Sequence, residues 1–135
     1  MPVRVMTVDD QPMFRAIAHD LIDGMAGFEP VLEAASGAEA IEAAERLRPE
    51  LVLVDVRMPG MSGIEVCREL KDRLATAVIV LVTSGDCADV ARLVRSCGAV
   101  ALLAKQNLNP AVIRGIWMIH GPVPSPEDEH IRRRA

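Results

Sequence analysis

Six side chains that could do chemistry follow short apolar runs of the sequence. In chain order they are Asp9, Asp10, Asp55, Thr83, Ser84 and Lys105. Neighbouring carboxylates repel one another unless a cation joins them. Oxygen ligands without a nearby His or Cys favour a hard ion such as Mg²⁺. An Asp carboxylate can also act as a nucleophile and form an aspartyl phosphate, while a cation and an ammonium neutralise charge on the transferring group.

Taken singly, these side chains have ordinary structural explanations. An Asp after a strand is often only a helix cap, and a Thr at that place is usually a turn residue. A lone Lys at a strand end is most often a solvated charge. Independent capping rarely places three carboxylates, a hydroxyl and an amine at one edge of a sheet, so the set favours a functional site.

The apolar runs are predicted to be the strands that position these side chains. Their length and β-branched content favour strands, and three of them are apolar throughout, which is typical of parallel strands covered on both faces. Ligands of an open parallel sheet bind beyond the carboxyl ends of its strands, which is where the six side chains stand. The predicted strands are Val3–Val8, Phe28–Ala34, Leu51–Val54, Ala77–Val82 and Val100–Ala104.

Helix signals separate the strands, so the sequence predicts an α/β fold with a (βα)₅ doubly wound parallel sheet. Two Ser-x-x-Glu capping boxes and an Asn-Pro pair are among the predicted helix starts. The starts are Pro12, Ser36 with Glu39, Ser62 with Glu65, Asp86, and Asn109 with Pro110, and the ends are Pro49 and Gly98.

Composition indicates one soluble cytoplasmic domain. The chain has 135 residues and a net charge of -4, which gives no general attraction to nucleic acid. Cys67, Cys87 and Cys97 have no metal-binding spacing and indicate reduced thiols. The N-terminus lacks a signal-peptide profile, and no apolar run is long enough to span a membrane.

Four stretches of the sequence resemble the receiver domains of bacterial response regulators. The resemblance covers about residues 3–120 and implies the flavodoxin-like receiver fold with strand order 2-1-3-4-5. It is most similar to the subfamily that usually carries a C-terminal helix-turn-helix. The stretches are VDDQPMFR at Val8–Arg15, LVLVDVRMPGMSGIEV at Leu51–Val66, VTS at Val82–Ser84 and GAVALLAK at Gly98–Lys105.

The resemblance implies a Mg²⁺ cofactor and a phosphoryl acceptor. Asp55 is expected to accept the phosphoryl group from a histidine kinase. Asp10 and Asp55 are expected to bind Mg²⁺ directly, Asp9 to act largely through water, and the backbone carbonyl of Arg57 to complete the metal site.

The resemblance also implies how the phosphoryl group is held and sensed. Thr83 is expected to hydrogen-bond the phosphoryl group, and Lys105 to pair with it. The added charge would draw Thr83 and the loop after the fourth strand inward, which biases a surface with two states. Leu102 departs from the family, because receivers of this kind usually have an aromatic residue there.

We expect residues 1–120 to be the receiver domain and residues 121–135 to be a flexible charged tail, with no effector domain. The expected function is a phosphorylation-dependent switch in a two-component system or phosphorelay, with no enzyme activity beyond self-phosphotransfer onto Asp55 and its hydrolysis. Its partners would be a histidine kinase or phosphotransfer protein and a target protein. A homodimer is possible, and neither nucleic acid nor membrane binding is expected.

Two other functions fit the same fold. A pseudo-receiver adaptor would bind a partner without phosphorylation, and the intact set of acidic residues with Thr83 and Lys105 argues against it. A phosphatase with an aspartyl-phosphate intermediate would need a second acid near the nucleophile. The residue two positions after Asp55 is Arg57, which argues against the phosphatase.

The output surface is expected on the fourth helix, the fifth strand and the fifth helix. Both apolar stripes of the last helix can belong to the core, since such stripes are more often core than interface. Alternatively, Trp117 is partly exposed and anchors a partner. We expect the second arrangement, with Leu102, Ile113 and Trp117 on a surface for homodimerisation or target docking. The two stripes are Val112, Ile116 and Ile119, and Ile113 with Trp117.

Overall fold

The structure is a computed structural model that describes residues 1–85 and 87–122. The predicted helix cap Asp86 and all but the start of the predicted tail lie outside the described residues. In the part of the chain that the structure describes, no helix has the length and apolar character needed to cross a membrane.

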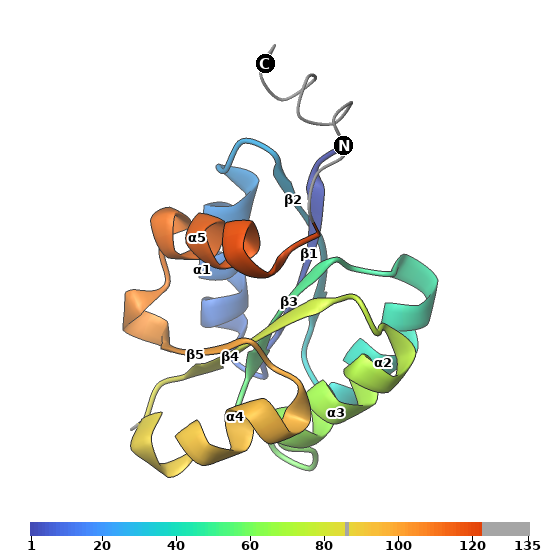
Figure 1. The fold of residues 1–135 in the computed structure, drawn as a ribbon, viewed down its shortest axis with the longest axis vertical. Helices are drawn as coiled ribbons and strands as arrows, with labels where there is room; N and C mark the ends of the chain where they lie inside the picture. The colour runs from blue at the N-terminus through green and yellow to red at the C-terminus, as the bar shows by residue number, and fades with distance from the viewer. Residues whose placement is uncertain (86, 123–135) are drawn as a thin grey trace.

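Five parallel strands form one sheet in the order β2-β1-β3-β4-β5, as predicted. The register pairs Val8 with Val54, and Thr83 with Ala104. The carboxyl ends of β1, β3, β4 and β5 therefore meet at one edge of the sheet (Figure 1). The strands are β1 (Val3–Val8), β2 (Phe28–Ala34), β3 (Leu51–Asp55), β4 (Val78–Thr83) and β5 (Ala101–Ala104).

Four of the five predicted helix starts are confirmed, whereas the fourth helix begins at Ala91, later than a cap at Asp86 predicts. Glu39 N donates to Ser36 Oγ at 3.2 Å, and Glu65 N donates to Ser62 Oγ at 3.3 Å. The Asn109 side chain accepts from Val112 N at 3.0 Å. The helices are α1 (Pro12–Asp23), α2 (Gly37–Leu47), α3 (Gly63–Arg73), α4 (Ala91–Cys97) and α5 (Pro110–His120), with short 3₁₀ turns η1 (Cys87–Asp89) and η2 (Lys105–Asn107).

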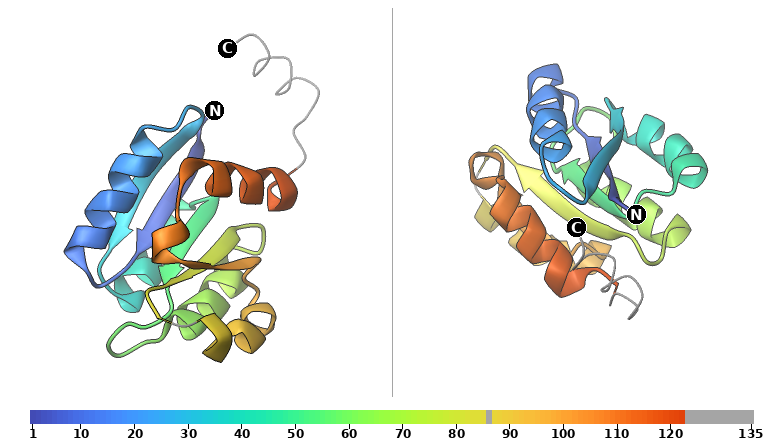
Figure 2. Two further views of the ribbon diagram at one scale, coloured as in Figure 1. Left: turned by 90° about the vertical axis from the view of Figure 1, so that its left-hand side faces the viewer. Right: turned by 90° about the horizontal axis from the view of Figure 1, so that it is seen from above.

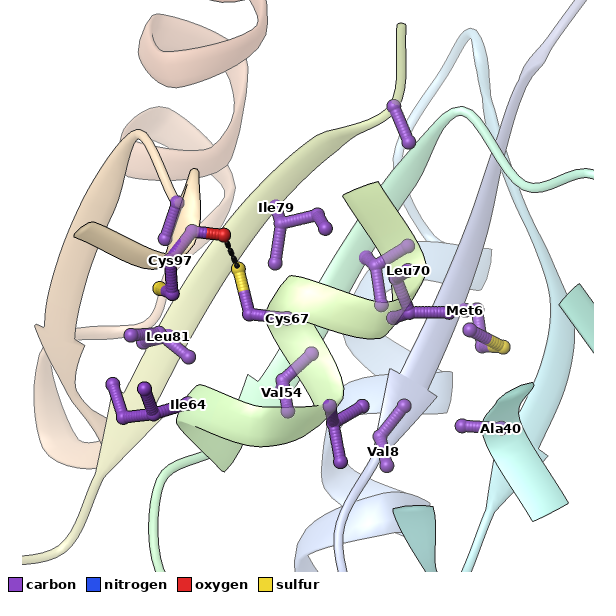
Figure 3. Close-up of a cluster of buried hydrophobic side chains, with 14 of the residues drawn as sticks. Met6, Val8, Ala40, Val54, Ile64, Cys67, Leu70, Ile79, Leu81 and Cys97 are labelled. Atoms are coloured by element: carbon purple, nitrogen blue, oxygen red, sulfur yellow. Dashed lines mark hydrogen bonds between the residues drawn. The ribbon is translucent and has the colours of Figure 1, made fainter. Parts of the chain in front are cut away.

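The sheet separates two hydrophobic clusters, one under each layer of helices. Figure 2 shows α1 and α5 on one face, and Figure 1 shows α2, α3 and α4 on the other. Met6 and Ile79 belong to the cluster under α2–α4, where Cys67 Sγ donates to the backbone oxygen of Cys97 at 3.2 Å (Figure 3). Helices thus cover both faces, which explains why the central strands are apolar throughout.

The expectation that Trp117 is partly exposed is wrong. Trp117 is only 9% exposed and Ile113 only 1%, and both pack in the cluster under α1 and α5. Ile119, predicted to face the sheet, is 76% exposed. Apolar residues occupy most of the circumference of α5, so periodicity alone did not select the buried stripe, and the largest apolar side chain gains most from burial. Leu102 is half-buried and packs against the other cluster.

Candidate functional site

The predicted site residues converge at the carboxyl edge of the sheet. Asp9 directly follows β1, Asp55 ends β3, Thr83 ends β4 and Lys105 directly follows β5. One carboxylate oxygen from each of Asp9, Asp10 and Asp55 lies within 4.8 Å of the other two. Strand order and register therefore bring together side chains that are far apart in the sequence.

Asp9 is a fully buried carboxylate at the centre of this cluster. Its Oδ1 accepts a hydrogen bond from the backbone N–H of Gln11 at 2.8 Å, and its Oδ2 lies 2.7 Å from Lys105 Nζ. The Arg15 guanidinium donates to the backbone oxygen of Asp9 at 2.7 Å. Although Oδ2 is close to the ammonium, it accepts no well-oriented hydrogen bond from any described residue. A buried anionic oxygen in this condition is well placed to bind a cation.

Asp55 is buried beside Asp9, and this environment opposes its ionisation. Burial, followed by repulsion from Asp9, raises the pKa of the Asp55 carboxyl to about 6. Attraction to Lys105 and a hydrogen bond from the backbone N–H of Arg57 to Oδ1, at 3.3 Å, act in the opposite direction. The carboxylate is still mostly ionised at neutral pH, and a divalent cation would relieve the repulsion that it suffers.

Lys105 supplies the positive charge of the site. Its Nζ lies 3.7 Å from Asp55 Oδ2 and donates to Gln11 Oε1 at 3.0 Å. The ammonium also lies 4.5 Å from the centroid of the Phe14 ring. Gln11 and Phe14 were not predicted from the sequence. The available signal was their position at the cap and in the first turn of a helix that directly follows two carboxylates.

The Thr83 hydroxyl lies at the end of β4 and is 1% exposed. Its Oγ1 accepts from the backbone N–H of Gly85 at 3.1 Å, which ties it to the loop after β4. A hydroxyl that accepts one hydrogen bond still has a proton to donate. Thr83 can therefore link an anion bound at the sheet edge to the conformation of this loop.

Gly63 holds the first turn of α3 against the backbone at the end of β3. The Gly63 N–H donates to the Val56 carbonyl at 2.8 Å. A Cβ atom at Gly63 would lie 2.2 Å from the Asp55 carbonyl oxygen and 2.7 Å from Val56 Cα, which are impossible contacts. The sequence motif MPGMSG contained this glycine, but its close approach to Asp55 became evident only from the structure.

The donor set fits a hard divalent cation such as Mg²⁺. Three carboxylates supply oxygen ligands, of which Asp9 and Asp55 are buried and Asp10 is exposed. Burial and then repulsion from Asp9 raise the pKa of Asp55, and the second cause reflects the concentration of negative charge in the cluster. An exposed Asp10 beside two buried carboxylates leaves the cluster accessible from solvent. Such a site can bind a cation and an anion side by side.

Comparisons with known proteins match most of the chain. The family model described as the response regulator receiver domain matches residues 5–115. The nitrate/nitrite response regulator protein NarP of Escherichia coli is 36% identical over 112 residues, which cover 83% of this chain and 52% of that protein. The transcriptional regulatory protein PdtaR of Mycobacterium tuberculosis is 34% identical over 116 residues, covering 83% of this chain and 56% of that protein. The chain thus spans about half the length of these relatives.

A solved structure is similar over the whole chain. The two-component response regulator of the LuxR family from Aurantimonas sp. SI85-9A1 has a TM-score of 0.79 and 28% sequence identity, and the match covers 100% of both chains. The receiver domain of the putative response regulator NarL from Mycobacterium tuberculosis also has a TM-score of 0.79, with 26% identity over 88% of this chain and 96% of that one. The likeness therefore covers the overall fold of the chain.

Proposed function

The chain belongs to the response regulator receiver domain family, and on this premise we propose that it is a phosphorylation-dependent switch that accepts a phosphoryl group on Asp55. The observation that carries the proposal is the position of Asp55. Its carboxylate ends the central strand β3, lies beside two further carboxylates and is 3.7 Å from the ammonium of Lys105. The ammonium is therefore close enough to the Asp55 carboxylate to contact the oxygens of a phosphoryl group attached to it.

The proposed reaction takes place at the Asp55 carboxylate. A carboxylate oxygen forms a bond to phosphorus while the bond from phosphorus to a histidine nitrogen of the donor protein breaks. Lys105 neutralises charge on the phosphoryl oxygens, and the Thr83 hydroxyl donates to one of them. Asp9, Asp10, Asp55 and the backbone carbonyl of Arg57 would hold Mg²⁺. When bound, this cation would supply further neutralisation of the transferring group.

The switch is proposed to act through Thr83 and the loop after β4. In the present structure the Thr83 hydroxyl contacts Gly85, so a new hydrogen bond to a phosphoryl group would change how this loop is held. Leu102 is half-buried beside the α2–α4 cluster and lacks the bulk of an aromatic ring. We therefore propose that the output change is carried mainly by the loop and α4.

The proposed partners are a histidine kinase or phosphotransfer protein and a target protein, in the cytoplasm. Homodimerisation is one possible form of output. The domain is proposed not to bind nucleic acid by itself, since the chain carries a net charge of -4. Tight, salt-sensitive binding to duplex DNA in a gel-shift assay would contradict this part of the proposal.

Labelling with acetyl phosphate and Mg²⁺ tests the acceptor directly. Intact-mass measurement should show one added phosphoryl group on the wild-type protein and none on Asp55→Asn. Asp72→Asn is the matched control, because Asp72 is an exposed carboxylate on α3, and it should label normally. Labelling of Asp55→Asn would refute the assignment. Unlabelled wild type would favour an adaptor, and continuous release of phosphate would favour a phosphatase.

A further inference from the structure

Gln11 contacts both members of the buried ion pair in the site. Its backbone N–H donates to Asp9 Oδ1 at 2.8 Å, while its side-chain Oε1 accepts from Lys105 Nζ at 3.0 Å. The same ammonium lies 2.7 Å from Asp9 Oδ2. Gln11 therefore bridges a carboxylate that follows β1 and a cation that follows β5, although these strands are not neighbours in the sheet.

The side chain of Gln11 neither caps a helix nor packs in the core. Gln11 is the cap residue of α1, but its side chain makes no capping hydrogen bond, and Pro12 is the first helical residue. The side chain is exposed, so it contributes little to the core. Among the described residues, its one hydrogen-bond partner is the Lys105 ammonium. An exposed amide that is ordered by a single contact with a functional ammonium points to a role in placing that ammonium.

Lys105 needs such placement because its side chain is intrinsically mobile. A lysine ammonium is a point charge on a four-carbon stem with many rotamers. Here the ammonium is restrained by three contacts: Asp9 Oδ2 at 2.7 Å, Gln11 Oε1 at 3.0 Å and the Phe14 ring at 4.5 Å. Gln11 is the only neutral hydrogen-bond acceptor among these three contacts. In this position Nζ is 3.7 Å from Asp55 Oδ2. That is just beyond a direct hydrogen bond, and it leaves the ammonium close to any oxygen attached to Asp55.

We propose that Gln11 is a positioning residue for phosphoryl transfer, acting through Lys105; this inference rests on the proposed function of Asp55. With acetyl phosphate as donor, a carboxylate oxygen of Asp55 bonds to phosphorus as the bond from phosphorus to the acetyl oxygen breaks. Acetate leaves with the electron pair, and no proton has to move. Negative charge on the phosphoryl oxygens is met by an ammonium that Gln11 already holds in place.

Two substitutions that keep the side-chain length of Gln11 distinguish the effect of its hydrogen-bond acceptor Oε1 from the effect of its packing. Gln11→Met keeps the length of the side chain and removes Oε1, and it should lower the rate of labelling by acetyl phosphate about three- to tenfold at saturating Mg²⁺. Gln11→Glu keeps an acceptor oxygen at the same reach, and it should restore most of the rate. Met13→Ala is the control, because Met13 is 77% exposed in the same helical turn and should label at the wild-type rate.

A double-mutant cycle with Lys105→Met shows whether Gln11 acts through the lysine. In that background Gln11→Met should cause no further loss of labelling rate, because the ammonium that it would position is gone. An equal loss in both backgrounds, or no loss in either, would overturn the proposal. If Lys105→Met labels too slowly to measure, the same double-mutant cycle can be carried out on the midpoint of urea unfolding, which tests the coupling of Gln11 and Lys105 independently of labelling. The destabilisation by Gln11→Met should then vanish when Lys105 is absent.

The two proposals fail in different ways. If wild-type protein is not labelled at all, the proposed acceptor function fails, whereas the urea cycle still reports whether Gln11 and Lys105 are coupled. If wild type labels normally and Gln11→Met labels equally fast, only the positioning role of Gln11 fails. Titration with Mg²⁺ alone should give the same affinity for wild type and Gln11→Met. A large loss of Mg²⁺ affinity would show that Gln11 acts on the metal site instead of on Lys105.

Discussion

The ammonium of Lys105 lies 2.7 Å from Oδ2 of the fully buried Asp9. A buried carboxylate that loses its cation leaves an uncompensated charge in a region of low dielectric constant. Lys105 therefore has a structural effect in the resting protein that is separate from its proposed effect on the phosphoryl group.

Lys105→Met should lower the free energy of unfolding by about 3–5 kcal/mol in metal-free buffer at neutral pH, because the buried Asp9 carboxylate loses the ammonium that compensates it. Saturating Mg²⁺ should stabilise this variant more than it stabilises the wild type, since a second cation replaces the missing ammonium. Urea unfolding with and without Mg²⁺ measures both effects. If Mg²⁺ stabilised the two proteins equally, the ion would not compensate the negative charge that the Lys105 ammonium compensates in the wild type, and the prediction would be wrong.

The raised pKa of Asp55 should appear in the pH dependence of stability. Burial, and then repulsion from Asp9, raises this pKa from 3.8 to about 6. Between these values the folded protein holds a proton that the unfolded chain has lost, so its stability decreases as the pH rises through this range. Asp55→Asn has no such group. In metal-free buffer its stability should therefore increase relative to that of the wild type by about 3 kcal/mol as the pH rises from about 3 to above about 7.

Urea unfolding of both proteins over the same pH range isolates the contribution of Asp55, because every other titrating group is common to the two. A difference in stability that does not change with pH would contradict the raised pKa. Added Mg²⁺ should reduce the difference, since the cation stabilises the charged carboxylate of the wild type and competes with the proton.

Gly63→Ala should destabilise the domain by about 2 kcal/mol or more, because its Cβ would collide with backbone atoms of Asp55 and Val56. The matched control is Gly115→Ala in α5, where a Cβ would meet no atom within 4 Å. Alanine favours a helix over glycine, so this variant should be more stable by up to about 1 kcal/mol. Thermal unfolding of both variants gives the comparison, and a neutral Gly63→Ala would contradict the close contact.

Trp117→Ala should cost about 3–5 kcal/mol, since Trp117 is 9% exposed and packs under α5. Met118→Ala is the neighbouring control and should change stability by no more than about 0.5 kcal/mol, because Met118 is 82% exposed. Urea unfolding followed by far-ultraviolet circular dichroism measures both variants without depending on tryptophan fluorescence. A small cost for Trp117→Ala would restore it as a candidate for an exposed partner contact.

The sequence predicted the strands, their parallel arrangement and the acidic cluster because each depends on local patterns. Fully apolar runs identified β3 and β4, and side chains after strand ends identified Asp55 and Thr83. It did not predict the orientation of α5, because apolar residues on most of its surface leave the buried side to tertiary packing. Nor did it predict the link between Gln11 and Lys105, which are 94 residues apart and meet only through the folded sheet.

The unequal burial of the strands has a consequence for local opening. Every residue of β3 and β4 is buried, whereas every residue of β5 is only half-buried and the strand has four residues at the sheet edge. Amide hydrogens of β5 should therefore exchange with solvent through low-energy local fluctuations, while those of β3 should exchange only on global unfolding. Asp55 thus stands on a fully buried central strand, whereas its counter-cation, Lys105, directly follows a half-buried edge strand. Local opening of β5 should therefore release the ammonium while the Asp55 strand stays folded.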